Sequence, residues 1–350
     1  MCTAKAIIVV EEGKRAAIQD VPVPKIRDEW ILVRTKAVGL NPTDWKHVDM
    51  SYANAGTKLG CDYAGVVVEV GSKVAHFKEG DRVAGFCHGG HRLDHETGAF
   101  GEYVLAKANA QFLIPDDLSF EQAAVLPVAL FTCGLGLYQS LGLPSPRNPA
   151  KEPVPILING GSTGTGMLAI QFGKLSGLTV IATASPHNFD YLKSLGADFV
   201  FDYRSPTAGA EINNVTQNKL ALAWDCSGGG PSLCAAALSS VEPSRYGTIA
   251  NPDPGPLKTN PLVEGPLNVL TYDVIGEVYE FLGNMVRPSA EYADDAGTWR
   301  DLWEELLHKK AFKLTRVDVN RNGKGLEGVM KGLDELRQGN VSGTKLAYTL

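Results

Sequence analysis

The chain has 350 residues, 44% of them hydrophobic, with 39 acidic and 33 basic side chains and a formal net charge of −6 at pH 7. This length predicts two domains, each large enough to bury a core of its own. The mild negative charge argues against a nucleic acid or an anionic membrane surface as partner. The first residues lead directly into strand-like sequence without a signal peptide, so we expect a cytoplasmic protein.

Two further features bear on the cellular compartment. The longest apolar stretch, residues 125–137, contains Pro127 and is too short for a bilayer, so no membrane span is expected. Six cysteines lie scattered at positions 2, 61, 87, 133, 226 and 234 without a C-x-x-C pair. Such scattered cysteines favour a reducing compartment over a disulfide framework.

The first 125 residues have a β-rich pattern in which short apolar runs alternate with Gly, Pro and Asp turns. The expected strands are Lys5–Glu11, Trp30–Gly39, Tyr63–Val70, Arg82–Phe86 and Glu102–Ala106. Ser119 with Gln122 three residues later is typical of a capped helix start, and the apolar helix that follows extends past Gly134. A proline-rich connection then leads from residue 144 to residue 155.

Residues 154–185 predict a strand, a glycine-rich turn, a helix and a second strand. The apolar run at residues 156–158 suits a strand buried on both faces, and the helix is expected to end at Gly177. In a right-handed βαβ unit such a turn lies at the carboxyl edge of the sheet, where a helix N-terminus binds a pyrophosphate.

The turn itself, with glycines at 160, 161, 164 and 166, is not a regular G-x-G-x-x-G, so tight packing alone is the alternative explanation. The expected cofactor contacts in this turn are Gly161, Ser162, Thr163, Gly164 and Thr165.

The end of the second strand indicates which dinucleotide binds. An NAD site usually places a carboxylate there for the ribose 2′-hydroxyl. This chain instead has Ser185, Pro186, His187 and Asn188, and no carboxylate before Asp190. Ser, His and Asn side chains can donate hydrogen bonds to a 2′-phosphate, which favours NADP over NAD. Alternatively, Asn188 caps the helix expected at residues 189–195.

The alternation of strands and helices continues and predicts a doubly wound parallel sheet. The expected strands of this sheet are Asp198–Tyr203, Leu220–Cys226 and Tyr246–Ala250, and its expected helices are Phe189–Leu195 and Ser232–Val241. In the tail of the chain we expect the helices Trp299–Lys309 and Leu326–Arg337 and the strands Phe312–Val319 and Lys345–Leu350. Residues 251–266 are rich in Pro and Gly and are expected to form a loop.

Several phrases resemble a known superfamily. Residues 39–46, GLNPTDWK, resemble the N-P-x-D segment of the quinone oxidoreductase and enoyl reductase branch of the medium-chain dehydrogenases/reductases. Residues 60–65 (GCDYAG), 70–71 (VG) and 80–83 (GDRV) resemble that superfamily's chaperonin-10-like domain. Residues 160–163 (GGST), 185–190 (SPHNFD) and 201–204 (FDYR) resemble the trans-acting enoyl reductases of fungal polyketide pathways.

The resemblance covers nearly the whole chain and implies an α/β fold. Its parts would be a chaperonin-10-like catalytic domain at residues 1–125, a Rossmann NADP-binding domain at 126–275, and a C-terminal segment, 276–350, that returns to the catalytic domain. It further implies a monomer or homodimer that uses NADPH. The partner would be a polyketide synthase, or a polyketide synthase–peptide synthetase hybrid, that presents an enoyl thioester on its acyl carrier protein.

The zinc ligands of the superfamily's alcohol dehydrogenases are not matched. Asn41 stands where those enzymes have their first cysteine, and Gly60-Cys61-Asp62 stands where they have Gly-His-Glu. The four-cysteine structural lobe is also missing, so no metal is expected. The one competing candidate is the segment 87–95, CHGGHRLDH, whose side chains could bind a metal if the loop folded suitably.

Conjugate reduction fits a metal-free site better than alcohol oxidation, because the enzyme then needs only to place a hydride, stabilise an enolate and supply a proton. The resemblance assigns the enolate or the proton to Lys46, since burial can tune a lysine to donate near neutral pH; a solvated surface lysine is the alternative. Thr132 is the second expected catalytic residue, although its hydroxyl could simply bond its own helix.

The remaining expected contacts fall into two sets. Further cofactor contacts are Asp44, Trp45, Lys46, His47, Tyr203, Ala250, Asn251, Val341 and Ser342, and substrate contacts are Leu126, Pro127, Phe131, Leu270, Thr271, Tyr272 and Val274. Asn41 and Asp44 would mainly shape the start of a helix. Two other functions stay open: a quinone or enone oxidoreductase that acts alone, and a structural or sensor protein that binds NADPH without turnover.

Overall fold

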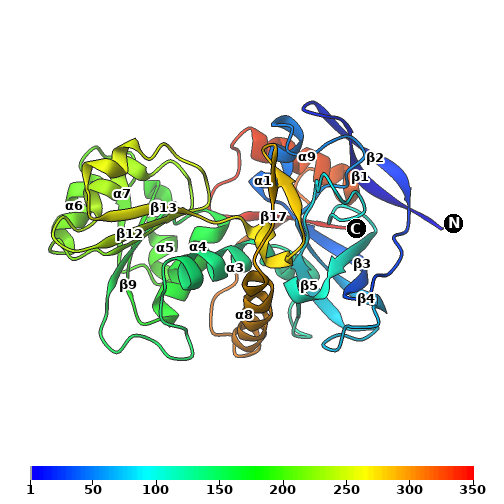
Figure 1. Ribbon diagram of the computed structural model, residues 1–350, viewed down its shortest axis with the longest axis horizontal. Coiled ribbons are helices and arrows are strands. Elements are labelled where there is room, and N and C mark those ends of the chain that lie inside the picture. Colours follow the sequence, from blue (N-terminus) through cyan, green and yellow to red (C-terminus); the bar gives the residue numbers. More distant parts are fainter. Residues whose placement is uncertain (1) are drawn as a thin grey trace. The chain divides into compact units, whose positions relative to one another are not determined.

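The computed structural model describes residues 2–350 and divides into two compact units. The first unit combines Met1–Phe131 with Tyr272–Leu350, and the second is Thr132–Thr271. In Figure 1 the first unit therefore contains both ends of the colour scale, and the second contains the green and yellow-green elements. The units divide at residues 131/132 and 271/272, a few residues from the expected boundaries at 125 and 275.

The first unit is mainly antiparallel β-structure. Its strands are β1 (Thr3–Glu11), β2 (Arg15–Pro22), β3 (Trp30–Gly39), β4 (Asp62–Val70), β5 (Arg82–Phe86), β6 (Tyr103–Lys107), β7 (Gln111–Leu113), β14 (Tyr279–Phe281), β15 (Asn284–Val286), β16 (Val317–Val319) and β17 (Lys345–Thr349). Seven of them form one sheet in the order β16-β17-β3-β4-β5-β7, with β6 also paired to β3. Strand β17 pairs antiparallel with β3, with Ala347 opposite Gly39, so the last strand of the chain joins the N-terminal sheet.

Helices cover this sheet and fix its edges. They are α1 (Pro42–Asp49), α2 (Phe120–Ala123), α3 (Pro127–Cys133), α8 (Ala290–His308) and α9 (Gly325–Arg337), with short 3-10 turns η1 (Ala108–Ala110) and η5 (Thr271–Ile275). The core between them is apolar and includes Val33, Tyr63 and Phe100. Arg337 of α9 binds Asp49 at the end of α1 with a nitrogen–oxygen distance of 2.6 Å, so α9 holds α1 in place.

The second unit is a parallel sheet with helices. Its strands are β8 (Pro155–Asn159), β9 (Thr179–Ala184), β10 (Phe199–Asp202), β11 (Leu222–Asp225), β12 (Ser244–Thr248) and β13 (Val263–Asn268). Its helical segments are η2 (Gly134–Ser140), α4 (Gly164–Leu175), η3 (Pro186–Asn188), α5 (Phe189–Ser194), α6 (Ala208–Val215), α7 (Pro231–Ala237) and η4 (Gly255–Thr259). The strand order is β10-β9-β8-β11-β12-β13, and every pair is parallel. The order reverses between β8 and β11, where sheets of this kind bind ligands at the carboxyl ends of the strands.

The expected fold class is confirmed, with local differences. Strands β2 and β7, helix α6 and the β14–β15 hairpin were not expected. The predicted loop at 251–266 was wrong, because it contains η4 and most of the edge strand β13. An edge strand tolerates the prolines and glycines that hide it in the sequence.

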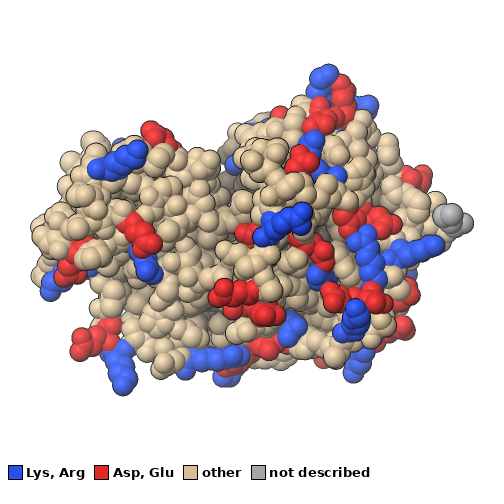
Figure 2. Space-filling view, in the orientation of Figure 1, with Lys and Arg blue, Asp and Glu red and all other residues tan. Residues whose placement is uncertain are grey.

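The apolar stretch at residues 125–137, expected to be too short for a bilayer, lies inside a longer helical run. The helical run Phe120–Ser140 has 21 residues and is long and apolar enough to cross a bilayer by length and composition. Length therefore does not exclude a span, but 78% of its apolar window is buried inside the protein, as in a core helix. All six cysteines are free. Figure 2 shows acidic and basic side chains interspersed over the face in view, without an extended basic area on that face.

Candidate active site

Helix α1 begins at a buried capping arrangement. Asn41 is the N-cap residue, Pro42 takes the first helical position, and the Asn41 backbone N–H donates to Asp44 Oδ2 at 2.7 Å. The Asp44 carboxyl is 1% exposed, and its burial raises its pKa to about 7. Asp44 therefore fixes the start of the helix, as expected, and its contact with the cofactor stays a prediction.

Asp62, at the start of β4, connects three segments of the first unit. Its carboxylate accepts from Asn41 Nδ2 at 2.7 Å and from the Val128 backbone N–H, near the start of α3, at 2.7 Å. The Lys345 ammonium lies 3.7 Å away, donates to the Leu40 carbonyl at 2.9 Å and also bonds Asn41 Oδ1. Burial raises the pKa of Asp62 to about 6, and Lys345 opposes that rise.

The same cluster occupies the positions that were compared with zinc ligands. Asn41 and Asp62 bind a cation, but it is the ammonium of Lys345, which is 7% exposed. Burial raises the pKa of the neighbouring Cys61 thiol well above its ordinary value, which disfavours the thiolate that a metal would require. These donors are therefore a poor match to a zinc site.

Lys46 and His47 follow on α1 with different surroundings. Lys46 is half-buried rather than buried as expected, and its Nζ lies 5.8 Å from the centre of the Trp45 ring. Among residues 2–350 its ammonium has no hydrogen-bond or ion-pair partner. His47 is buried, which lowers its pKa to about 4, and its Nδ1 donates to the Thr43 carbonyl at 2.7 Å. A free ammonium thus lies beside a neutral imidazole.

The glycine turn of the second unit has the geometry of a phosphate cradle. Gly160 has a φ of +78°, which favours glycine. A side chain at Gly166 would place its Cβ 2.3 Å from the Gly160 carbonyl oxygen, so this glycine lets α4 approach β8 closely. Thr163 caps α4 by accepting from the Gly166 N–H at 3.0 Å. The turn residues 162–165 stay half-exposed, so a pyrophosphate at this helix N-terminus fits the residues present.

A polar network lies at the sheet's switch point and was not expected from the sequence. Asn159 at the end of β8 donates to Asp225 at the end of β11 at 2.8 Å, and Tyr246 donates to the same carboxylate at 2.7 Å. Burial alone would raise the pKa of Asp225, but these hydrogen bonds and those from Ser227 lower it. The glycines at 228–230, just after Asp225, were the sequence signal that could have identified this network.

The ends of β9 and β10 place the residues expected at the 2′-phosphate. Ser185 is half-buried, His187 is exposed, and the Asn188 amide lies 3.2 Å from His187 Nε2. Asn188 is the N-cap residue of α5, as the capping alternative expected, although within the described part of the chain its side chain makes no cap hydrogen bond to that helix. Tyr203 is 51% exposed, and the Arg204 guanidinium lies 5.4 Å from its ring centre and also binds Asp202.

Arg204 was missed as a candidate. Asp202, the last residue of β10, pairs with Ala184, the last residue of β9. Because the two strands are parallel, the segments that follow them begin side by side at the same edge of the sheet. This pairing brings the Arg204 segment close to Ser185. The sequence showed the arginine but not this neighbour.

Thr132 and Thr271, one expected catalytic and one expected substrate residue, are brought together in the second unit. Their Oγ1 atoms lie 2.6 Å apart. Asn251, after β12, accepts from Asn268 at 3.1 Å. Tyr272, the next residue after Thr271, belongs to the first unit, where its hydroxyl lies 2.8 Å from Thr43 Oγ1.

The expected site residues are divided between the units. The first unit holds Asp44, Trp45, Lys46, His47, Leu126, Pro127, Phe131, Tyr272, Val274, Val341 and Ser342. The second holds Gly161, Ser162, Thr163, Gly164, Thr165, Ser185, Pro186, His187, Asn188, Tyr203, Ala250, Asn251, Thr132, Leu270 and Thr271. Leu126, Phe131 and Val274 are fully buried core side chains, whereas Leu270 is half-buried.

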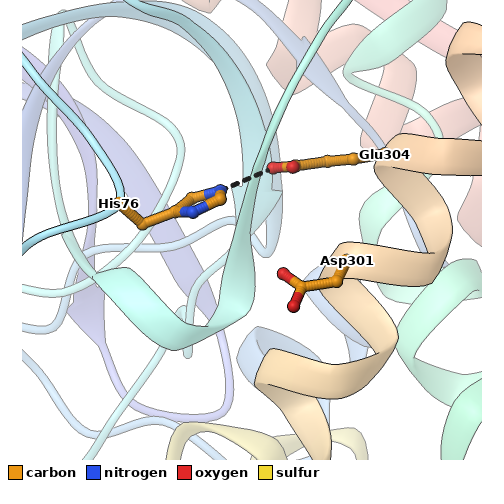
Figure 3. Close-up of side chains that lie close together, drawn as sticks. All are labelled: His76, Asp301 and Glu304. Atoms are coloured by element: carbon orange, nitrogen blue, oxygen red, sulfur yellow. Dashed lines mark hydrogen bonds and ion pairs between the residues drawn. The ribbon is translucent and has the colours of Figure 1, made fainter.

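One surface cluster has the composition of a metal site. His76, Asp301 and Glu304 place ligand atoms within 4.8 Å of one another, with both acids on α8 (Figure 3). Glu304 Oε1, however, already lies 3.0 Å from His76 Nε2 and accepts the Leu113 N–H at 2.7 Å. Asp301 binds Arg300 at 2.7 Å. The three side chains thus already have ion-pair and hydrogen-bond partners, and these contacts hold α8 to the sheet.

Comparisons with known proteins identify the chain's relatives. Residues 27–116 match the family described as alcohol dehydrogenase GroES-like domain, and residues 164–269 match zinc-binding dehydrogenase. The trans-enoyl reductase ACTTS2 of Alternaria alternata is 41% identical over 354 aligned residues, which cover 100% of both chains. The trans-enoyl reductase TOXD of Cochliobolus carbonum is 51% identical over 226 residues, 64% of this chain and 76% of that one.

A solved structure shows the same fold. An alcohol dehydrogenase superfamily protein from Novosphingobium aromaticivorans superposes with a TM-score of 0.80 at 22% identity, over 99% of each chain.

Proposed function

The chain belongs to the family of fungal trans-enoyl reductases, and we propose that it reduces the α,β-double bond of a polyketide enoyl thioester with NADPH. The observation that carries the proposal is the 41% identity over the full length of both chains with a trans-enoyl reductase. A nicotinamide cofactor follows from the family and its fold. We propose the phosphorylated form, NADPH, as the one this protein uses.

The choice of NADPH rests on the ends of β9 and β10. Ser185, His187 and Asn188 offer hydrogen-bond donors and no carboxylate at the end of β9. Arg204 adds a guanidinium on the neighbouring segment. A 2′-phosphate would gain charge-assisted hydrogen bonds there, whereas a bare ribose hydroxyl would lack its usual acidic partner.

Bound NADPH would supply the hydride that adds to the β-carbon of the enoyl group. The charge that then develops on the thioester oxygen needs a nearby cation or hydrogen-bond donor. Lys46 is our candidate, because its ammonium has no partner within residues 2–350. It would stabilise the enolate oxygen or deliver the proton to the α-carbon. Thr132, held by Thr271, would orient the nicotinamide amide or the substrate.

The protein's proposed partner is a megasynthase and its proposed location is the cytoplasm. We expect the protein to work in the cytoplasm with a polyketide synthase, or a synthase–peptide synthetase hybrid, whose carrier protein presents the substrate. We expect a monomer or homodimer. No metal takes part in this scheme, because the groups at the compared zinc positions bind Lys345.

The test follows NADPH oxidation with crotonyl pantetheine, a carrier-bound enoyl thioester and a free quinone. We expect the carrier-bound thioester to be reduced fastest, the quinone far more slowly, and EDTA to change nothing. A faster quinone reaction would instead support the oxidoreductase that acts alone, and binding without turnover would support a sensor. Activity lost with EDTA and restored by zinc would contradict the metal-free scheme.

The role of Lys46 is tested by Lys46→Met, with the exposed Lys73→Met as the matched control. Because a positioned proton donor contributes about 10²–10⁴-fold, Lys46→Met should lower kcat by about 100-fold or more. Lys73→Met should leave kcat unchanged. An unchanged kcat in Lys46→Met would remove Lys46 from the mechanism.

A further inference from the structure

A cavity of about 330 Å³ lies within the first unit, which is in the size range of small-molecule sites. Its wall combines aromatic and apolar side chains with polar and charged ones. The residues that matter here are Trp30, Phe86, His88, His91, Tyr272 and Ile275. Of these six, only Tyr272 was among the expected cofactor or substrate contacts.

Two buried histidines face this cavity. His88 is 4% and His91 is 5% exposed, and their ring centres lie 4.4 Å apart. The His88 ring stacks on Tyr272 at 3.9 Å and 15°. Within residues 2–350, three ring nitrogens have no hydrogen-bond partner: both nitrogens of His88 and the Nε2 of His91. These ring nitrogens lie in the wall of the cavity and have no protein partner, so they are available to hydrogen-bond a ligand there.

The hydrogen-bonding character of these atoms follows from their surroundings. His91 Nδ1 accepts the backbone N–H groups of Leu93 and Asp94 at 3.1 and 3.2 Å. In a neutral ring the proton is then on Nε2, which is a donor. Burial lowers the pKa of both histidines, so both are neutral at pH 7, and His88 adds one donor and one acceptor. The cavity thus offers donors to an oxygen atom.

The charged side chains around the cavity are already paired. Arg27 binds both oxygens of the Asp94 carboxylate, with 3.0 Å between its Nη2 and Oδ1. Lys107 binds the Glu277 carboxylate. No unpaired charge is therefore left among these four groups to attract an ion. An uncharged ligand with an oxygen substituent fits this lining better than a carboxylate or a phosphate.

The cavity wall also lies next to the proposed catalytic helix. The Tyr272 hydroxyl is 2.8 Å from Thr43 Oγ1 on α1 and 3.4 Å from His47 Nε2. Thr43 precedes Lys46 by three residues, which places both on neighbouring positions of one helix face. Tyr272 thus connects the cavity wall to α1, the helix that carries Lys46.

We propose that the cavity receives the distal part of the acyl chain, and that His88 and His91 hydrogen-bond a hydroxyl or keto oxygen on it. This inference rests on the proposed function and names its substrate class: enoyl thioesters whose chain carries an oxygen, in preference to plain alkyl chains. Trp30, Phe86 and Ile275 would contact the methylene groups.

The test measures binding apart from turnover. Calorimetry compares octanoyl pantetheine with its 5-, 6- and 7-hydroxy forms on the wild type, on His88→Phe and on the control His95→Phe. Phenylalanine keeps the ring that stacks on Tyr272 but removes both nitrogens. His95 lies in the same loop, is exposed and is outside the cavity lining.

We expect at least one hydroxylated thioester to bind the wild type and His95→Phe about tenfold more tightly than the plain thioester, as one extra hydrogen bond allows. This preference should vanish in His88→Phe. Equal binding of all four thioesters to the wild type, or a preference that survives in His88→Phe, would overturn the inference. Circular dichroism checks that each variant is folded.

A second variant does not depend on the histidines. Val278 also lines the cavity, so Val278→Trp narrows it and should weaken octanoyl pantetheine binding about tenfold or more. Failure of the wild type to reduce any enoyl thioester would count against the proposed function. Reduction of crotonyl pantetheine together with unchanged octanoyl binding in Val278→Trp would count against the cavity alone.

Discussion

Substitution of Lys345 by methionine should destabilise the first unit strongly. Lys345 is 7% exposed, and its ammonium is held by the Leu40 carbonyl, by Asn41 and by Asp62, 3.7 Å away. Methionine keeps most of the side-chain volume but leaves the Asp62 carboxylate buried without its cation. Removing one partner of a buried ion pair costs about 3–5 kcal/mol, so the free energy of unfolding at pH 7 should fall by that amount.

The loss should depend on pH in a defined direction. The pKa of Asp62 is about 6 in the intact protein and rises further without Lys345. A raised carboxyl pKa lowers stability as pH rises, because the unfolded state ionises first, by about 1.4 kcal/mol per pH unit. Between pH 6 and pH 7 the wild type completes its titration at Asp62, whereas the variant shows more of this slope. The difference between variant and wild type should therefore narrow by up to about 1 kcal/mol on going from pH 7 to pH 6.

The assay is urea unfolding followed by circular dichroism at both pH values. Lys310→Met is the matched control, since it breaks a Lys–Asp pair whose lysine is 73% exposed, and exposed pairs contribute about 0–1 kcal/mol. In the double variant Lys345→Met/Asp62→Asn the loss should be smaller than the sum of the single losses by about 1–3 kcal/mol. A loss below about 1 kcal/mol for Lys345→Met, or strict additivity, would refute the argument that this pair is coupled.

Two further substitutions test the second unit. Ser185→Asp places a carboxylate where the 2′-phosphate is proposed to bind. The ratio of kcat/KM for NADPH over NADH should therefore drop at least about tenfold, which is about 1.4 kcal/mol of discrimination between the two cofactors. An unchanged ratio would place the phosphate elsewhere. Gly166→Val puts a Cβ 2.3 Å from the Gly160 carbonyl oxygen, and this clash should lower the free energy of unfolding by about 1–3 kcal/mol and weaken cofactor binding in calorimetry. Gly297→Ala, whose nearest neighbour is the Arg300 guanidinium at 3.9 Å, should do neither.

The sequence by itself determined the elements whose signal is local. The apolar run at Ile156–Ile158, the turn glycines and the helix ending at Gly177, with its φ of +82°, predict a strand–turn–helix unit wherever the chain places it. The capping pair Ser119 and Gln122 marked the start of α2 for the same reason. Periodicity and capping depend on residues a few positions apart, so they can be recognised without the fold.

Only the tertiary structure decided which distant residues meet. Asp62 and Lys345 lie far apart in sequence and become partners because β17 pairs with β3 beside β4. His88 stacks on Tyr272, and Thr132 meets Thr271, through the same kind of long-range placement. A lysine near the C-terminus and a histidine in a loop carry no local signal of burial. Their burial and their partners arise from contacts between distant parts of the chain, which set the desolvation that a local pattern cannot supply.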